Sequence, residues 1–237
     1  MNDIWTVNET AFEPKRQHHT ETVFTIGNGY LSTRGAFEEG YPGDHRATFI
    51  HGVFDAVALV ITELANAPDW LPLTVLLDGE RFALDRGDVL DFKRELDLRT
   101  GLLTRVVRWQ SPAGLTATLT FERFVSLADE HLAYIRCTVV PEAACEIEFR
   151  AGLHGAMDNE GAAHWLRLDQ GSHDSDGPLP TVHLHTRTRT SGIDWVGAMR
   201  LIGSGGRRAA AMFWDVDNAP TLVLKVKATA GKPVSAE

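Results

Sequence analysis

The sequence contains few cysteines, no long hydrophobic run and no basic leader. Cys137 and Cys145 are its only cysteines, too few for the disulfide framework of a small secreted domain. Cys137 lies on the apolar side of an alternating run, which predicts a reduced, buried thiol. The longest apolar run, Ala56 to Ile61, is far shorter than the roughly 20 residues that cross a membrane. Together these absences predict a cytoplasmic chain with no membrane partner.

Basic residues are also scarce. The chain has 23 Lys and Arg against 32 Asp and Glu, a formal net charge of −9. Nucleic-acid surfaces gain much of their affinity by neutralising phosphates with Lys and Arg, so this balance argues against a nucleic-acid partner. The sequence also lacks a Walker phosphate loop and a nucleophile-elbow serine. What remains is an acidic chain of ordinary globular composition, with 43% hydrophobic residues.

From Leu71 onward, apolar and polar residues alternate with a period of two. This period is typical of strands with one buried face, and it is clearest from Leu115 to Glu122. Turn signals such as Asp78-Gly79 and Thr100-Gly101 separate the strands. Many long antiparallel strands predict two stacked sheets in a single all-β domain. The predicted strands are 73–77, 81–84, 89–99, 102–110, 115–122, 131–140, 145–152, 164–169, 181–190, 195–202, 209–216 and 221–228.

Several segments depart from this alternation. Asp55 to Asn66 is the only helix candidate, but its β-branched residues favour an extended segment or a short helix. Gln170 to Pro180 is polar and contains Gly and Pro, which predicts a long exposed loop, and Gly203 to Gly206 predicts a hairpin loop. After the strand at 221–228 the chain turns at Gly231 and stops. We expect no return strand, an unpaired edge and a domain truncated near its C-terminal end.

The most distinctive stretch is Glu21 to Gly40, ETVFTIGNGYLSTRGAFEEG. Its glycines permit positive φ or close backbone approach, and Asn28 tolerates the left-handed region. Arg34 offers a fixed fork of donors for carboxylates or other acceptors. The combination predicts a shaped, hydrogen-bonded loop.

The order of residues over most of positions 1–130 resembles the N-terminal domain of glycoside hydrolase family 65, the maltose, trehalose and kojibiose phosphorylases with their hydrolase relatives. The resemblance thins beyond Glu142. The matching positions are Phe12, Glu21-Thr22, Phe24 to Gly29, Arg34-Gly35, Glu38, Gly52 to Asp55, Glu63-Leu64, Asn66, Pro68 to Trp70, Asp78-Gly79, Arg94 to Asp97, Gly101, Arg105, Trp109, Phe121 to Phe124 and Ser126-Leu127.

The resemblance implies an antiparallel β-supersandwich of the galactose mutarotase-like type, with few or no helices, formed by residues 1–237 as one N-terminal domain. In the family, the acid and the phosphate-binding groups lie on a following (α/α)6 barrel, where phosphate or water attacks the anomeric carbon with inversion. This sequence shows no helical period of that kind. The resemblance therefore implies a non-catalytic domain that supports the barrel, the rim of its site and a homodimer. Its partners would be its own barrel and α-linked glucose disaccharides, with no cofactor, and with inorganic phosphate as co-substrate of a phosphorylase.

The residues themselves offer no defensible catalytic pair. Glycoside hydrolysis needs a general acid and a base or nucleophile at a set separation. The adjacent carboxylates are Glu38-Glu39, Asp129-Glu130 and Glu146/Glu148, and charged residues are mostly solvated on loops or strand faces. We therefore assign no catalytic residue.

Four residues are candidates for a substrate rim or a domain interface: Asn28, Arg34, Glu38 and Trp70. Arg34 could bridge acidic groups of a catalytic domain or lie near substrate; alternatively, it pairs with Glu38 or a neighbouring carboxylate inside its own loop. Trp70 could stack on a sugar, but its proline-flanked position is also typical of an anchor packed under a loop.

Histidines raise two further hypotheses. His18-His19 and His183/His185 could ligate a metal, but Arg187 and Arg189 continue the second strand face, so we predict a cationic exposed face and no metal site. A histidine with a glutamate also serves in mutarotase-like epimerases, which makes a stand-alone aldose epimerase an alternative by analogy of fold. A carbohydrate-binding module is a third alternative.

Overall fold

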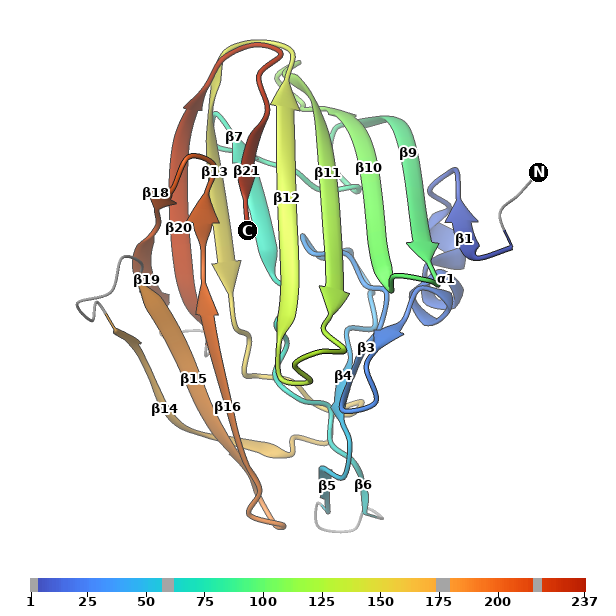
Figure 1. Cartoon of the computed structure of the whole chain (residues 1–237), viewed down its shortest axis with the longest axis vertical. Coiled ribbons are helices and arrows are strands. Elements are labelled where there is room, and N and C mark those ends of the chain that lie inside the picture. The colour runs from blue at the N-terminus through green and yellow to red at the C-terminus, as the bar shows by residue number, and fades with distance from the viewer. Residues whose placement is uncertain (1–3, 57–61, 174–179, 215–218) are drawn as a thin grey trace.

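The computed structural model describes residues 4–56, 62–173, 180–214 and 219–237. Within this part of the chain, regular structure is almost entirely antiparallel β-sheet, with η1 (Pro14–Arg16) and the short helix α1 (Gln17–Val23) near the N-terminus (Figure 1). The predicted all-β antiparallel class is confirmed. None of the helices in the described ranges has the length and hydropathy that a membrane crossing requires.

An eight-stranded sheet forms one wall of the domain. Its order is β1-β9-β10-β11-β12-β21-β17-β18, antiparallel throughout. The alternating residues of its long strands leave one face for packing and one for solvent. The bounds are β1 (Thr6–Glu9), β9 (Asp88–Asp97), β10 (Leu102–Gln110), β11 (Thr116–Val125), β12 (Ala133–Pro141), β17 (Ile202–Gly203), β18 (Arg207–Arg208) and β21 (Val234–Ala236).

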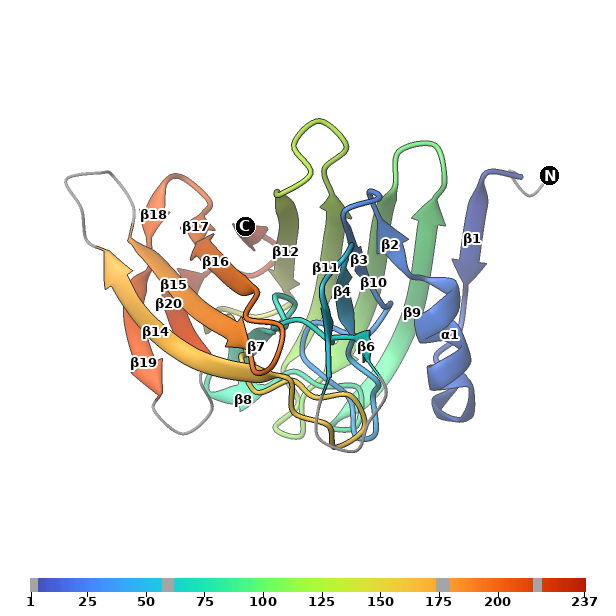
Figure 2. The ribbon, with the colours of Figure 1, turned by 90° about the horizontal axis from the view of Figure 1, so that it is seen from below.

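A five-stranded sheet of order β19-β20-β13-β7-β8 lies behind the large sheet (Figure 1), and Figure 2 shows the two as separate layers. A three-stranded sheet, β14-β15-β16, and the small sheets β2-β3-β4 and β5-β6 complete the lower end. The bounds are β2 (Ile26–Gly27), β3 (Leu31–Thr33), β4 (Thr48–Ile50), β5 (Phe54–Asp55), β6 (Glu63–Leu64), β7 (Leu73–Leu77), β8 (Glu80–Arg81), β13 (Cys145–Gly152), β14 (Trp165–His173), β15 (Thr181–Thr188), β16 (Asp194–Arg200), β19 (Ala210–Trp214) and β20 (Ala219–Ala228).

The main core lies between the two large sheets. Val107, Trp109 and Leu119 from the eight-stranded sheet meet Ile147 and Phe149 from β13, and all five are fully buried. These are the apolar members of the period-two pattern, so the alternation seen in the sequence is what turns one face of each strand inward.

The predicted hairpin turns are present. Asp78 (φ 47°) and Gly79 (φ 84°) join β7 to β8 with the paired positive φ angles of a two-residue hairpin. Gly101 (φ 69°) follows β9 at the turn into β10, and Gly203 to Gly206 connects β17 to β18. Turn chemistry is local, which is why the sequence alone located these hairpins.

The helix α1 was not predicted from the sequence. Its seven residues, QHHTETV, follow a proline-initiated 3₁₀ turn and bury Gln17, Thr20 and Glu21. A helix of this length is too short to show an apolar period, and it buries polar side chains, so no pattern predicted it. The helix candidate Asp55 to Asn66 instead contains β5 and β6 at its ends, with 57–61 outside the described residues.

Two further expectations need correction. The strand β14 extends to His173, so residues 170–173 of the predicted loop are strand. Residues 174–179 lie outside the described residues, as do 215 and 216 of the strand predicted at 209–216. The strand at 221–228 is not an unpaired edge, because β20 lies between β13 and β19. A return strand, β21, exists but pairs with β12 in the other sheet. Sequence order could not reveal this exchange between sheets.

The two cysteines yield a direct chemical prediction. Cys137 and Cys145 are both free and buried, as predicted for Cys137. Burial raises the pKa of both thiols, and that of Cys137 well above its ordinary value. Because the thiolate is the reactive form, Ellman's reagent is expected to label neither residue in the native protein and both after denaturation. Rapid labelling of native Cys137 would contradict its placement in the core.

Candidate functional site

The segment 35–39 lies over three arginines that project from neighbouring strands of the large sheet. Arg94 on β9, Arg105 on β10 and Arg123 on β11 are each at most 2% exposed. Arg94 Nη1 donates to the carbonyl of Gly35 (2.8 Å), and Arg123 Nη1 donates to that of Ala36 (2.8 Å). The arginines therefore bind the distinctive loop through its backbone.

Two carboxylates of the same segment compensate these charges. Glu38 accepts from Arg105 (2.7 Å) and Arg123 (2.9 Å), and Glu39 accepts from both terminal nitrogens of Arg105, Nη1 at 2.6 Å. Burial alone would raise the pKa of Glu38, but Arg123 and Arg105 outweigh burial and lower it. The prediction that Glu38-Glu39 is solvated is wrong. Its partners lie 66–85 residues further along the chain, where no local pattern connects them to it.

Aromatic rings enclose this ion cluster. The guanidinium of Arg94 lies 4.2 Å from the ring centre of Phe24, and that of Arg105 lies 4.5 Å from Phe37 and 4.3 Å from Phe121. Rings at this distance attract the cations and exclude water, so the paired charges interact in a medium of low polarity. The cluster is thus architecture that holds the loop to the sheet, with Glu38 at its centre.

Asn28 also has an internal role. Its Oδ1 accepts from the N–H groups of Tyr30 (3.1 Å) and Leu31 (2.8 Å), which shapes the turn between β2 and β3. Its Nδ2 donates to the carbonyls of Ser126 (2.8 Å) and Glu130 (3.0 Å) in the β11–β12 hairpin. The amide therefore ties two hairpins together.

Arg34 pairs with Glu21 and not with Glu38. Its Nη2 lies 3.4 Å from Glu21 Oε2 and donates to the carbonyl of His18 (3.1 Å), while its side chain remains 25% exposed. Trp70 donates from Nε1 to Thr33 (2.9 Å), and its half-buried ring packs against a small apolar cluster. Of the four candidates, Arg34 is the one that lines the polar hollow described next.

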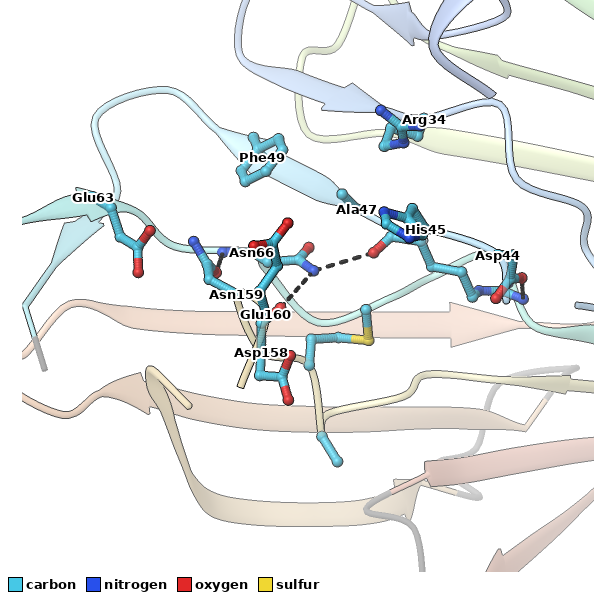
Figure 3. A pocket seen from close by; sticks show the side chains of 13 residues that line it. Arg34, Asp44, His45, Ala47, Phe49, Glu63, Asn66, Asp158, Asn159 and Glu160 are labelled. Carbon is cyan, nitrogen blue, oxygen red and sulfur yellow. Dashed lines mark hydrogen bonds and ion pairs between the residues drawn. The ribbon is translucent and has the colours of Figure 1, made fainter. Parts of the chain in front are cut away.

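This hollow is a pocket with a volume of about 740 Å³. Figure 3 shows Arg34 and Phe49 on the side opposite Asp158, with Glu63 and Asp44 at opposite ends. Its charged lining residues are Arg34, Asp44, Arg46, Glu63, Asp158 and Glu160. Among these, only Arg34 was a predicted site residue; Glu63 was noted as a position that matches the family, without a role.

Asn66 joins the two walls of the pocket. Its side chain accepts from Thr48 N (2.9 Å) and donates to the carbonyls of Arg46 (3.2 Å) and Asp158 (3.1 Å). Its backbone N–H donates to Asn159 Oδ1 (2.8 Å). Because Asn66 is 5% exposed and uses its whole amide, it fixes the loop around 158–160 against the strand β4.

The histidines and Arg187 on one face of β15 each contact a carboxylate. His183 Nε2 lies 3.1 Å from Asp169, His185 Nε2 lies 3.0 Å from Asp194, and Arg187 makes two bonds to Asp194 at 2.7 and 2.8 Å. The predicted cationic face therefore has acidic partners, because β14 contributes Asp169 and β16 contributes Asp194 beside it. Among the described residues, no group of three His, Cys, Asp or Glu is arranged to hold a metal ion.

A buried histidine, His164, does pair with a glutamate. His164 Nδ1 lies 3.2 Å from Asp55 Oδ2, and its Nε2 lies 2.9 Å from Glu63 Oε1. The His164 side chain is fully buried, with 0% exposure, so it cannot touch a sugar ring directly. The pair thus does not favour the epimerase alternative.

The fold and the sequence agree with one family of known proteins. The solved structure of a putative kojibiose phosphorylase from the human microbiome superimposes with a TM-score of 0.86, covering 100% of this chain and 32% of that one; at 20% identity, this likeness shows the fold alone. Residues 7–237 match the model of the glycosyl hydrolase family 65 N-terminal domain. The chain belongs to glycosyl hydrolase family 65. The sandwich described above is the β-supersandwich of that family's N-terminal domain, as the resemblance implied.

The family 65 relatives are much longer than this chain. It is 37% identical over 190 residues to the kojibiose phosphorylase of Halothermothrix orenii, covering 80% of this chain and 24% of the relative. It is 33% identical over 171 residues to the α,α-trehalose phosphorylase of Thermoanaerobacter brockii, covering 65% and 22%. The chain thus spans less than a quarter of either relative.

Proposed function

We propose that this chain is the non-catalytic N-terminal domain of a cytoplasmic, inverting α-glucoside phosphorylase or hydrolase. The sandwich supports a catalytic (α/α)6 barrel, shapes the rim of its site and contributes to a homodimer. The observation that carries the proposal is the match of residues 7–237 to the N-terminal domain of a family whose members here are several times longer. The substrates would be α-linked glucose disaccharides, with inorganic phosphate as co-substrate of a phosphorylase.

The internal roles of three candidate residues support this scaffold function. Asn28, Glu38 and Trp70 use their polar groups within the domain, where they hold hairpins and loop together. Arg34 differs, because its guanidinium is partly exposed at the pocket. We infer that Arg34 and the pocket around it lie beside the barrel, at the rim of its site, since acidic and basic groups exposed together suit a polar surface next to another domain.

The purified chain is expected to show no turnover. Maltose, trehalose and kojibiose would be incubated with the chain, with and without inorganic phosphate, and glucose and glucose 1-phosphate measured. Release of either product above a heat-denatured control would overturn the non-catalytic assignment. Faster mutarotation of α-glucose with the chain than without it would favour the epimerase instead.

Arg34→Ala in a protein that includes the catalytic domain is expected to lower the melting temperature or weaken contact between the domains before it changes a chemical step. The reason is that Arg34 secures the end of α1 through Glu21 and His18, and no reacting atom is near it in this domain. Melting temperature, limited proteolysis and kcat would be compared with those of Arg108→Ala, a control at an exposed pair with Glu142. Normal stability with abolished turnover would contradict the scaffold role.

A further inference from the structure

The charges of the pocket restrict the ligands that it can take. Four carboxylates, those of Asp44, Glu63, Asp158 and Glu160, face two guanidiniums. Arg46 is already bonded to Asp69 (2.5 Å). The excess of negative charge disfavours phosphate and other anions, whereas neutral hydroxyl groups can donate to the carboxylates and accept from Arg34. A volume of about 740 Å³ is ample for one or two sugar rings.

Glu160 occupies a backbone conformation that glutamate rarely adopts. Its φ is 50°, and Gly161 follows with φ 96°, while Asn159 and Ala162 exchange backbone hydrogen bonds at 3.0 Å. Asn-Gly is the preferred sequence for such a two-residue turn, because asparagine and glycine tolerate positive φ better than other residues do. A glutamate in this disfavoured conformation, on the lining of the pocket, points to a role for its carboxylate.

Glu63, elsewhere on the lining, is oriented from behind by buried groups. His164 holds Glu63 Oε1 at 2.9 Å, and Asp55 holds the opposite side of the imidazole. Asp55 Oδ1 in turn accepts from the backbone N–H groups of Thr190 (3.0 Å) and Ser191 (2.7 Å). This chain of contacts fixes Glu63 through one oxygen and leaves the other to accept from a ligand.

We propose that the pocket is a binding subsite for a neutral sugar, in which Glu63 and Glu160 accept hydrogen bonds from sugar hydroxyls. The ligand class is glucose or an α-linked glucose disaccharide, and it excludes inorganic phosphate and sugar phosphates. Phe49 supplies an apolar surface beside these polar groups, a pairing that suits the two faces of a pyranose ring. The proposal rests on the proposed function for the choice of sugar, but it adds a site on the sandwich itself.

The test is a titration of the purified chain by calorimetry and protein-observed NMR. Glucose, maltose, kojibiose and trehalose are the candidate ligands, and inorganic phosphate and glucose 1-phosphate are the anionic comparison. We expect saturable binding of at least one neutral sugar, at least tenfold tighter than either phosphate compound. No sugar binding, or equal binding of the phosphates, would overturn the proposal.

The variant Glu160→Asn tests sugar binding without lowering the stability of the fold. Because asparagine suits the positive φ, this variant is expected to melt at the same temperature as the parent or higher, yet to bind sugar at least tenfold more weakly. Glu63→Gln is expected to weaken binding as well, and Glu130→Asn, an exposed carboxylate on the β11–β12 hairpin, to leave it unchanged. Undiminished binding in both pocket variants would refute the site.

Two outcomes distinguish this proposal from the scaffold function. If the chain neither turns over disaccharides nor binds sugars, the scaffold function stands and the sugar subsite is wrong. If a lysine-containing peptide shifts the NMR signals of the pocket while no sugar does, a protein segment occupies the pocket, and the sugar proposal is again wrong.

Discussion

Replacement of Glu38 by alanine is expected to lower the free energy of unfolding by about 3–5 kcal/mol. Glu38 is 5% exposed and is the carboxylate shared by Arg105 and Arg123. Its loss leaves the buried guanidinium of Arg123 without a carboxylate partner, while Arg105 keeps Glu39. The measurement is urea unfolding followed by tryptophan fluorescence and circular dichroism. Glu142→Ala, which breaks the exposed pair with Arg108, is the matched control and is expected to cost less than about 1 kcal/mol.

The pH dependence of this effect has a definite sign. The pKa of Glu38 is lowered in the folded protein, so the unfolded chain binds its proton more readily in acid. The contribution of Glu38 to stability is therefore complete above the unfolded pKa, about 4.3, and is lost as the pH falls through the folded value. The stability difference between parent and Glu38→Gln is expected to shrink below about pH 4. A difference that stays constant into stronger acid would show that the ion pairs do not stabilise the fold.

Replacement of Gly35 by alanine is expected to destabilise the domain by about 3 kcal/mol. A Cβ at this position would lie 2.7 Å from the Cβ of Phe24 and 3.0 Å from the carbonyl oxygen of Glu21. Glu21 lies in the last turn of α1, and Phe24 is the residue that follows the helix. Neither atom can move away as the tip of a flexible side chain can. The same shift would stretch the 2.7 Å bond from Gly35 N to Glu21 O and move the carbonyl that Arg94 binds.

Gly29→Ala in the same stretch is the control for this variant. Gly29 has φ 92°, but nothing lies within 4 Å of the position that a Cβ would take. Only the conformational penalty applies there, about 1–2 kcal/mol. Thermal and urea unfolding of both variants would be compared, and equal destabilisation would mean that close packing against α1 is not what requires Gly35.

The two parts of the Glu21 to Gly40 stretch differ in how much their sequence revealed. The glycines and Asn28 predicted a shaped loop correctly, because positive φ and side-chain capping are properties of a few adjacent residues. The environment of Glu38 was predicted wrongly, because its burial depends on arginines of β10 and β11 that come far later in the chain. Two adjacent glutamates, such as Glu38 and Glu39, have the same local sequence pattern whether the fold leaves them in solvent or buries them.

The pocket shows the same limit. Asp158, Glu160 and Glu63 lie in segments without regular periodicity, and the bonds from Asn66 that fix the loop of Asp158 form only in the folded protein. The dipeptide Glu160-Gly161 was the one local signal, since a glycine after a polar residue favours a tight turn. No sequence signal placed that turn opposite Arg34.

By itself the sequence determined most of the long strands from β7 onward, several hairpin turns, the buried Cys137 and, through its resemblance, the family. These follow from side-chain alternation and turn chemistry, which act between neighbours along the chain. Only the tertiary structure decided that β21 crosses to the large sheet, that Arg94, Arg105 and Arg123 enclose the loop at 35–39, and that carboxylates gather around one pocket. Those contacts join residues distant in sequence, and their strength comes from burial, which exists only once the sheets have packed.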